Sequence, residues 1–150
     1  MLRYARSKAV HSVTKNKIGL EVKGFDELIA NLEGLNGDTK RAVEGCLRVA
    51  RDTVAAKAKV AMNGHKRTGA TIESIITHDP VKWQGTLASI EAGFNLKHGG
   101  MPSIFLMYGT PKMPKDQALY DAVYGSRTRR EIAKKQKAIF DGMIRKRMGG

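Results

Sequence analysis

The chain has 150 residues and carries 27 Lys or Arg against 14 Asp or Glu, so its formal net charge is +13. This length fits one domain, and a hydrophobic content of 41% excludes a disordered basic tail. The longest uncharged run, residues 98–111, is shorter than the roughly 20 residues of a membrane helix, and the single cysteine, Cys46, excludes an internal disulfide and a cysteine-based zinc cluster. We expect a soluble domain, made inside the cell, without a secretory signal or a membrane span.

The positive charge is concentrated at the two ends of the sequence. Residues 1–17 have five basic and no acidic residues, residues 127–150 have nine basic and two acidic residues, and residues 18–126 are nearly neutral. Basic ends of this kind are typical of solvated surfaces, of segments that bind acidic protein partners, and of segments that neutralise phosphates. All three interpretations stay open at this point. The candidate partner-binding residues are Arg3, Arg6, Lys8, Arg127, Arg129, Arg130, Lys134 and Lys135.

The first half of the sequence predicts a strand followed by two helices. Alternating apolar and polar residues favour a half-buried strand over 18–23, and apolar residues three and four apart favour a helix over 25–35. A longer helix is expected to begin at Asp38 or Thr39, whose side chains can accept its free amide hydrogens, and to end near residue 62. One face of this helix is rich in alanine, and we expect that face to pack in the core rather than against another subunit.

The second half predicts strands and then helices. Residues 70–78 fit a short helix or a strand equally well, whereas 81–83 and 87–94 predict two strands joined by a turn. In the second strand one face would consist of Ala88, Ile90, Ala92 and Phe94, and the other of Leu87, Ser89, Glu91 and Gly93. The remaining segments are a mobile loop at 95–101, a dense apolar segment at 104–108, a short helix at 116–124 and a basic helix at 127–148.

This order of elements predicts an α+β fold in which long helices pack on one antiparallel sheet. We expect three parts: an extended basic N-terminal arm at 1–17, an α+β core domain at 18–126 and a basic C-terminal helix at 127–150. The sequence contains no internal repeat.

The sequence lacks the residue patterns of common catalytic and cofactor sites. The four histidines form no pair at helical metal-ligand spacing, the acidic residues are dispersed, and no phosphate-binding glycine loop is present. Cys46 falls on the inner face of the long helix, where it is expected to be a small core residue and not a nucleophile. Helix-turn-helix and aromatic RNA-binding patterns are also missing. We therefore expect no enzyme activity, no cofactor and no metal.

Two short motifs are more informative than any catalytic pattern. The first follows the long helix and consists of Arg67, Thr68, Gly69, Ser74 and Ile75. The second, some thirty residues later, places an aromatic residue before Gly-Thr and prolines, and consists of Tyr108, Gly109, Thr110 and Pro114. These two motifs make the chain resemble, over about residues 18–147, the minor tail or head–tail joining proteins of tailed bacteriophages. Many members of that family have an acidic residue two positions before the Gly-Thr, where this chain has Met107.

The resemblance implies a structural role in the virion, at the head–tail junction or in the tail, after assembly in the host cytoplasm. It implies a homo-oligomeric ring, for which six copies are favoured, and contacts with other neck and tail proteins. The basic ends of the sequence add passing DNA as a second candidate contact. The nine motif residues would then be candidate subunit-interface residues. It does not separate a tail terminator or tail-completion protein from an adjacent neck protein. The alternatives are a basic DNA-binding accessory protein and a small regulatory protein resembling an antitoxin.

Overall fold

The computed structural model of the chain describes residues 19–20, 37–65, 69–85 and 87–149. The described fold is mostly helical and contains one small antiparallel sheet, in agreement with the expected α+β class. The predicted arm at 1–17 and the predicted helix at 25–35 lie outside the described residues, as does most of the strand predicted at 18–23. The elements in chain order are β1 (Gly19–Leu20), α2 (Gly37–Ala61), η2 (Met62–His65), α3 (Ala70–Glu73), β2 (Lys82–Gln84), β3 (Leu87–Glu91), η3 (Leu96–His98), α4 (Pro102–Tyr108), α5 (Gln117–Tyr124) and α6 (Ser126–Met148).

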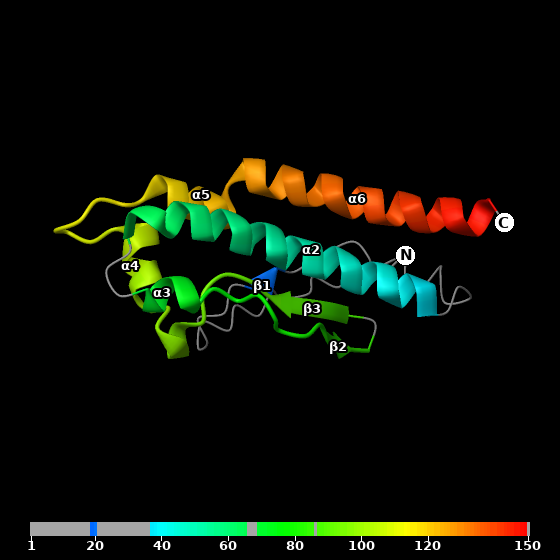
Figure 1. The fold of residues 1–150 in the computed structure, drawn as a ribbon, viewed down its shortest axis with the longest axis horizontal. Coiled ribbons are helices and arrows are strands. Elements are labelled where there is room, and N and C mark those ends of the chain that lie inside the picture. Colours follow the sequence, from blue (N-terminus) through cyan, green and yellow to red (C-terminus); the bar gives the residue numbers. More distant parts are fainter. Residues whose placement is uncertain (1–18, 21–36, 66–68, 86, 150) are drawn as a thin grey trace, which may run out of the picture.

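The long helix α2 lies at the centre of the molecule. It has the sheet on one side and α5 and α6 on the other, and α6 runs antiparallel along it (Figure 1). Its inner face is fully buried at Ala50 and Ala58, whose small side chains allow the neighbouring elements to approach closely. The predicted core face is therefore confirmed. The helix begins at Gly37, one residue earlier than expected, so Asp38 and Thr39 lie in its first turn.

The sheet has the strand order β1-β3-β2, and all its pairs are antiparallel. In β3 the predicted alternation is confirmed, because Ala88 and Ile90 are buried against α2. The regular strand ends at Glu91, earlier than predicted. Phe94 nevertheless continues the inner face, since it is 2% exposed and forms a single bridge with Ile75.

The segment that fitted both a helix and a strand contains both structures. Ala70–Glu73 forms the short helix α3, and Ile75 immediately after it pairs with Phe94 in the manner of a strand. The loop at 95–101 is tied down: Gly100 is buried, and its amide donates to the carbonyl of Asn95 at 3.0 Å. An added Cβ at Gly100 would lie 2.6 Å from the same carbonyl oxygen, so this position favours glycine.

The apolar segment at 104–108 belongs to a helix. Pro102 opens α4, where its missing amide hydrogen costs nothing, and Gly109 ends the helix. The short helix α5 has Leu119, Ala122 and Val123 buried, as predicted, and the basic helix α6 buries a narrow side at Ile132.

Candidate subunit-interface site

The two motifs differ in how well the structure describes them. Arg67 and Thr68 lie outside the described residues, so only the second part of the first motif can be placed. Gly69 has a φ of +78°, and Ser74 and Ile75 are buried. In the second motif Tyr108 is 56% exposed, Thr110 is half-buried and Pro114 is exposed.

The fold brings the two motif segments to the same end of the molecule, where α3 and α4 lie (Figure 1). They share a surface hollow to which the first segment contributes Thr71 and Ile72, and the second contributes Phe105, Leu106 and Met113. Met62 and His65, from η2 at the end of the long helix, also line this hollow. These two segments are distant in the sequence, and only the fold brings them together around one hollow.

Ser74 and Ile75 are fixed by hydrogen bonds within the core. The Ser74 hydroxyl donates to the carbonyl of Thr71 at 2.6 Å, and the Ser74 carbonyl accepts from the amide of Asn95 at 2.7 Å. The amide of Ile76 donates to the carbonyl of Gly93 at 2.8 Å. These bonds hold the end of α3 against residues 93–95, which follow β3, and the buried Ser74 and Ile75 side chains are not available for contact with a second molecule.

The second motif forms a small hairpin that projects from the end of the molecule between α4 and α5 (Figure 1). Thr110 and Met113 exchange two backbone hydrogen bonds of 2.8 and 3.1 Å. The amide of Asp116 donates to the carbonyl of Leu106 at 2.8 Å and closes the base of the hairpin. Gly109 turns the chain with a φ of +74°, a conformation that favours glycine.

A carboxylate joins the base of this hairpin to the end of the long helical stretch. Asp116 caps α5, because its side chain accepts the amide hydrogen of Leu119 at 3.0 Å, and it also pairs with the ring of His65. Partial burial raises the pKa of Asp116, but the Leu119 amide and the His65 ring together outweigh burial and leave that pKa below its usual value.

The charge on Asp116 is therefore expected to stabilise the fold above the carboxyl's unfolded pKa, about 3.9, and this contribution is lost as the pH falls through the lower folded pKa. Asp116→Asn keeps a capping oxygen but removes the charge, so the wild-type advantage should be fully present at pH 7 and smaller at pH 3, below the unfolded pKa. Asp116→Ala also removes the cap and should cost about 1 kcal/mol at both pH values. Urea unfolding at the two pH values measures both variants. An unchanged difference between wild type and Asp116→Asn would contradict this assignment.

Three tyrosines connect α4 to α5 beside the hairpin. The rings of Tyr108 and Tyr120 meet edge to face at 6.0 Å, and those of Tyr120 and Tyr124 lie 5.2 Å apart. The ammonium of Lys115 lies 3.6 Å from the centre of the Tyr120 ring. Burial and a hydrogen bond with Tyr108 raise the pKa of Tyr124, so its hydroxyl stays neutral. This cluster holds α4 at a fixed angle to α5.

On its outer side α4 exposes a row of large apolar side chains, which we call the α4 ridge. It consists of Met101, Phe105 and Tyr108, which are 47%, 51% and 56% exposed. Their spacing of four and three residues places them on one face, while Ser103 and Met107 face the core. Exposed apolar side chains grouped on one face are a common feature of protein contact surfaces. The sequence identified the apolar segment but not its outward face, because an almost wholly apolar run has no polar side to orient it.

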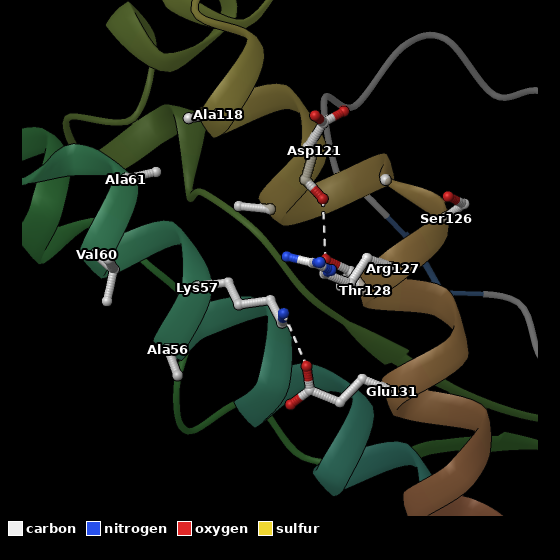
Figure 2. A pocket seen from close by; sticks show the side chains of 12 residues that line it. Ala56, Lys57, Val60, Ala61, Ala118, Asp121, Ser126, Arg127, Thr128 and Glu131 are labelled. Atoms are coloured by element: carbon white, nitrogen blue, oxygen red, sulfur yellow. Dashed lines mark hydrogen bonds and ion pairs between the residues drawn. The ribbon is translucent and has the colours of Figure 1, made fainter.

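A second hollow lies at the junction of α2, α5 and α6, and we call it the junction groove (Figure 2). It measures about 670 Å³, and a salt bridge of 2.7 Å between Lys57 and Glu131 crosses it. Lys57 and Lys135 lower the pKa of Glu131. The Thr128 hydroxyl donates to the carbonyl of Asp121 at 2.9 Å at its upper edge. Its apolar lining consists of Ala56, Val60, Ala61, Ala118 and Ala122.

The candidate basic residues do not form one group. Arg3, Arg6 and Lys8 lie outside the described residues. Arg127, Arg129, Arg130 and Lys134 are exposed on α6. Lys135 instead ties α6 to α2, because its ammonium contacts Glu131 at 3.0 Å and donates to the Thr53 hydroxyl at 3.1 Å.

Within the described ranges, no group of three or more His, Cys, Asp or Glu residues could hold a metal ion. Burial raises the pKa of the Cys46 thiol to about 11, so this thiol is protonated at neutral pH and unsuited to nucleophilic attack. None of the described helices is both long and apolar enough to span a membrane.

Comparison of the chain with protein-family models, with curated proteins and with solved structures finds no match.

Proposed function

We propose that this chain is a structural component of a tailed-phage virion, a ring-forming neck or tail-completion protein without catalytic activity. It would act at the head–tail junction or in the tail, after assembly in the host cytoplasm. Its partners would be further copies of itself, with six favoured, and neighbouring neck and tail proteins. The proposal rests on the resemblance carried by the two motifs.

The single structural observation that supports this function best is the α4 ridge. Met101, Phe105 and Tyr108 leave apolar surface in water next to the segments that carry the resemblance. Burying such surface against another protein is favourable by about 25 cal/mol per Å² before the costs of association are subtracted. A ridge beside the motifs is therefore well placed for a subunit contact.

A closed ring needs two different surfaces on each copy, because its subunits meet head to tail. The α4 ridge would be one surface and the junction groove the other. The small side chains Ala56, Ala61 and Ala118 leave room in the groove for a bulky residue such as Phe105. The two surfaces lie on different elements of the chain, so one copy can use both at once.

Phe105→Glu is expected to abolish ring formation, because it places a charge in the centre of the proposed apolar contact. Light-scattering mass measurement on the purified protein should change from a multiple of 16.5 kDa to a single chain. The matched control is Leu87→Glu, since Leu87 is an exposed apolar residue on the sheet, away from both surfaces, and its variant should keep the wild-type mass. Equal loss of assembly in both variants would contradict the assignment of the ridge.

Mixing two blocked variants tests the head-to-tail arrangement directly. Ala118→Trp fills the groove and should also give single chains. A mixture of Phe105→Glu and Ala118→Trp retains one intact ridge and one intact groove, and it should form heterodimers that grow no further. A mixture that stays monomeric would refute the ridge-and-groove pairing. A wild-type chain that is monomeric, never associates with tails or heads and binds duplex DNA at nanomolar concentration would instead favour the DNA-binding accessory protein.

A further inference from the structure

The outer side of α6 carries a row of cations that the fold does not use. Arg130, Lys134 and Arg145 are exposed, and their spacing of four and eleven residues keeps them on one side of the helix, opposite the buried Ile132. None of the three has an ion pair or a side-chain hydrogen bond with another described residue. Lys137 lies between Lys134 and Arg145 in the sequence and pairs, among the described residues, with Asp141, whose 43% exposed side chain lies on the same side of the helix. We call this row, Arg130, Lys134, Lys137 and Arg145, the α6 stripe.

The described acidic residues of a second copy are poor partners for this stripe. Most of them already face a cation or a capping amide within their own chain, and Asp121 accepts from Gln117 at 2.8 Å. Glu73 and Asp79 are the exceptions among the described acidic residues, and they lie on segments near the sheet. The acidic residues in ion pairs are Asp38, Glu44, Asp52, Glu91, Asp116, Glu131 and Asp141. Among the described residues, a second copy therefore offers few free carboxylates to the stripe.

The surroundings of the stripe favour phosphate over an acidic protein surface. Tight protein–protein contacts depend on a few large apolar or aromatic anchors at their centre. Between residues 126 and 142 the exposed positions of α6 hold cations, Ser126, Gly142 and the small residues Ala133 and Ala138, and the side chain of Asp141 is 43% exposed. Among the described residues, the one large apolar side chain exposed between the ends of the stripe is Ile144, which is 48% exposed beside Arg145. Phosphate backbones require only cations, because binding is driven by the release of counterions.

The length of the stripe also suits a duplex. Residues 130–145 span about 22 Å of helix, which corresponds to about six base pairs of DNA at 3.4 Å each. A straight helix of this length, exposed along one side of the molecule, can follow a strand of phosphates without any change in fold (Figure 1). Within the described residues Arg130, Lys134 and Arg145 make no side-chain hydrogen bond that would fix their orientation, so we expect the contact to depend on charge and not on sequence.

We propose that the α6 stripe binds the phosphate backbone of duplex DNA without sequence preference. This contact is independent of ring formation, although a ring would bring several stripes onto one duplex and raise the apparent affinity. Arg127 is left out of the stripe because it borders the junction groove, so the DNA contact and the subunit contact can be tested separately.

The test is fluorescence anisotropy of a labelled 25-base-pair duplex with the full chain, between 50 and 200 mM salt. The double variant Arg130→Gln/Lys134→Gln should bind at least tenfold more weakly at 50 mM. The slope of log K against log salt should become shallower by about 1.8, the value for two lost phosphate contacts. The matched control is Lys59→Gln/Lys97→Gln, which removes the same charge from exposed positions on α2 and η3 and should stay within about twofold of wild type.

Two further measurements make the outcome decisive. Phe105→Glu blocks the proposed ring contact but leaves the α6 stripe intact. It should therefore still bind the duplex in a salt-dependent way, as a single chain, so that loss of the ring and loss of DNA binding are measured separately. Polyglutamate at equal charge concentration should compete poorly. Three results would overturn the proposal. The two double variants could lose the same amount of DNA affinity, the wild type could bind the duplex without any salt dependence, or polyglutamate could bind as tightly as the duplex.

Discussion

Phe94→Ala is expected to lower the free energy of unfolding by about 3–5 kcal/mol, which is a large part of the stability of a domain of this size. The Phe94 side chain is 2% exposed and packs in the main hydrophobic cluster, which also contains Ala58, Met62 and Leu119. Its backbone forms the bridge to Ile75. Truncation would therefore leave a cavity between the long helix, α5 and the segment that carries the first motif.

The exposed Phe105 provides a matched control for this prediction. Phe105→Ala removes the same atoms from a side chain that is 51% exposed, so it should change the free energy of unfolding by less than about 1 kcal/mol. Urea unfolding followed by circular dichroism measures both variants in the monomer, at concentrations below assembly. Equal losses at the two positions would mean that the core is not centred on Phe94.

Gly109→Ala is expected to cost about 2–4 kcal/mol and to disrupt the hairpin of the second motif. Gly109 has a φ of +74° and a ψ of 173°, a combination that side chains avoid and that costs about 1–3 kcal/mol. An added Cβ would also lie 2.8 Å from the backbone nitrogen of Lys115 and 3.0 Å from the carbonyl oxygen of Met113. Both neighbours are backbone atoms of the hairpin, which would have to open.

A second glycine, Gly85, separates the backbone strain of a positive φ from the collision of the added Cβ. It has a φ of +62°, but an added Cβ would meet no atom within 4 Å, so Gly85→Ala carries the strain without the collision. It should cost about 1 kcal/mol. Urea unfolding gives the two values, and the mass measurement used for Phe105→Glu should show weaker assembly only for Gly109→Ala. A Gly109→Ala protein as stable as Gly85→Ala would show that the hairpin can adjust to the added side chain.

The sequence correctly predicted the buried face of an element where apolar and polar residues alternate with the period of a helix or a strand. The inner faces of α2, β3 and α5 were correctly identified because polar residues mark their outer sides. The outward face of α4 was not, since Phe105 and Met107 are both apolar and only the packing of Met107 against α5 decides which side is buried. Lys135 was grouped with the candidate partner-binding cations, but its contact with Thr53 depends on how two helices distant in sequence lie together.

The candidate site was predictable in its parts and not in its assembly. The two motifs were recognisable as short patterns, yet nothing local brings Ile72 next to Phe105. That proximity arises because Phe94 and Asn95 hold the first segment against the core while the closed hairpin base positions the second. The junction groove depends in the same way on small residues from three separate helices, including Ala56 and Ala118.

The central position of α2 has a consequence for how the molecule comes apart. Val43 and Leu47 belong to the cluster shared with the sheet, whereas Ala50, Val54 and Ala58 belong to the cluster shared with α5 and α6. Since one continuous helix supplies part of both clusters, neither can melt without removing the support of the other. We therefore expect the described body to unfold as a single cooperative unit, in which a disturbance at the sheet also destabilises α6 through the long helix.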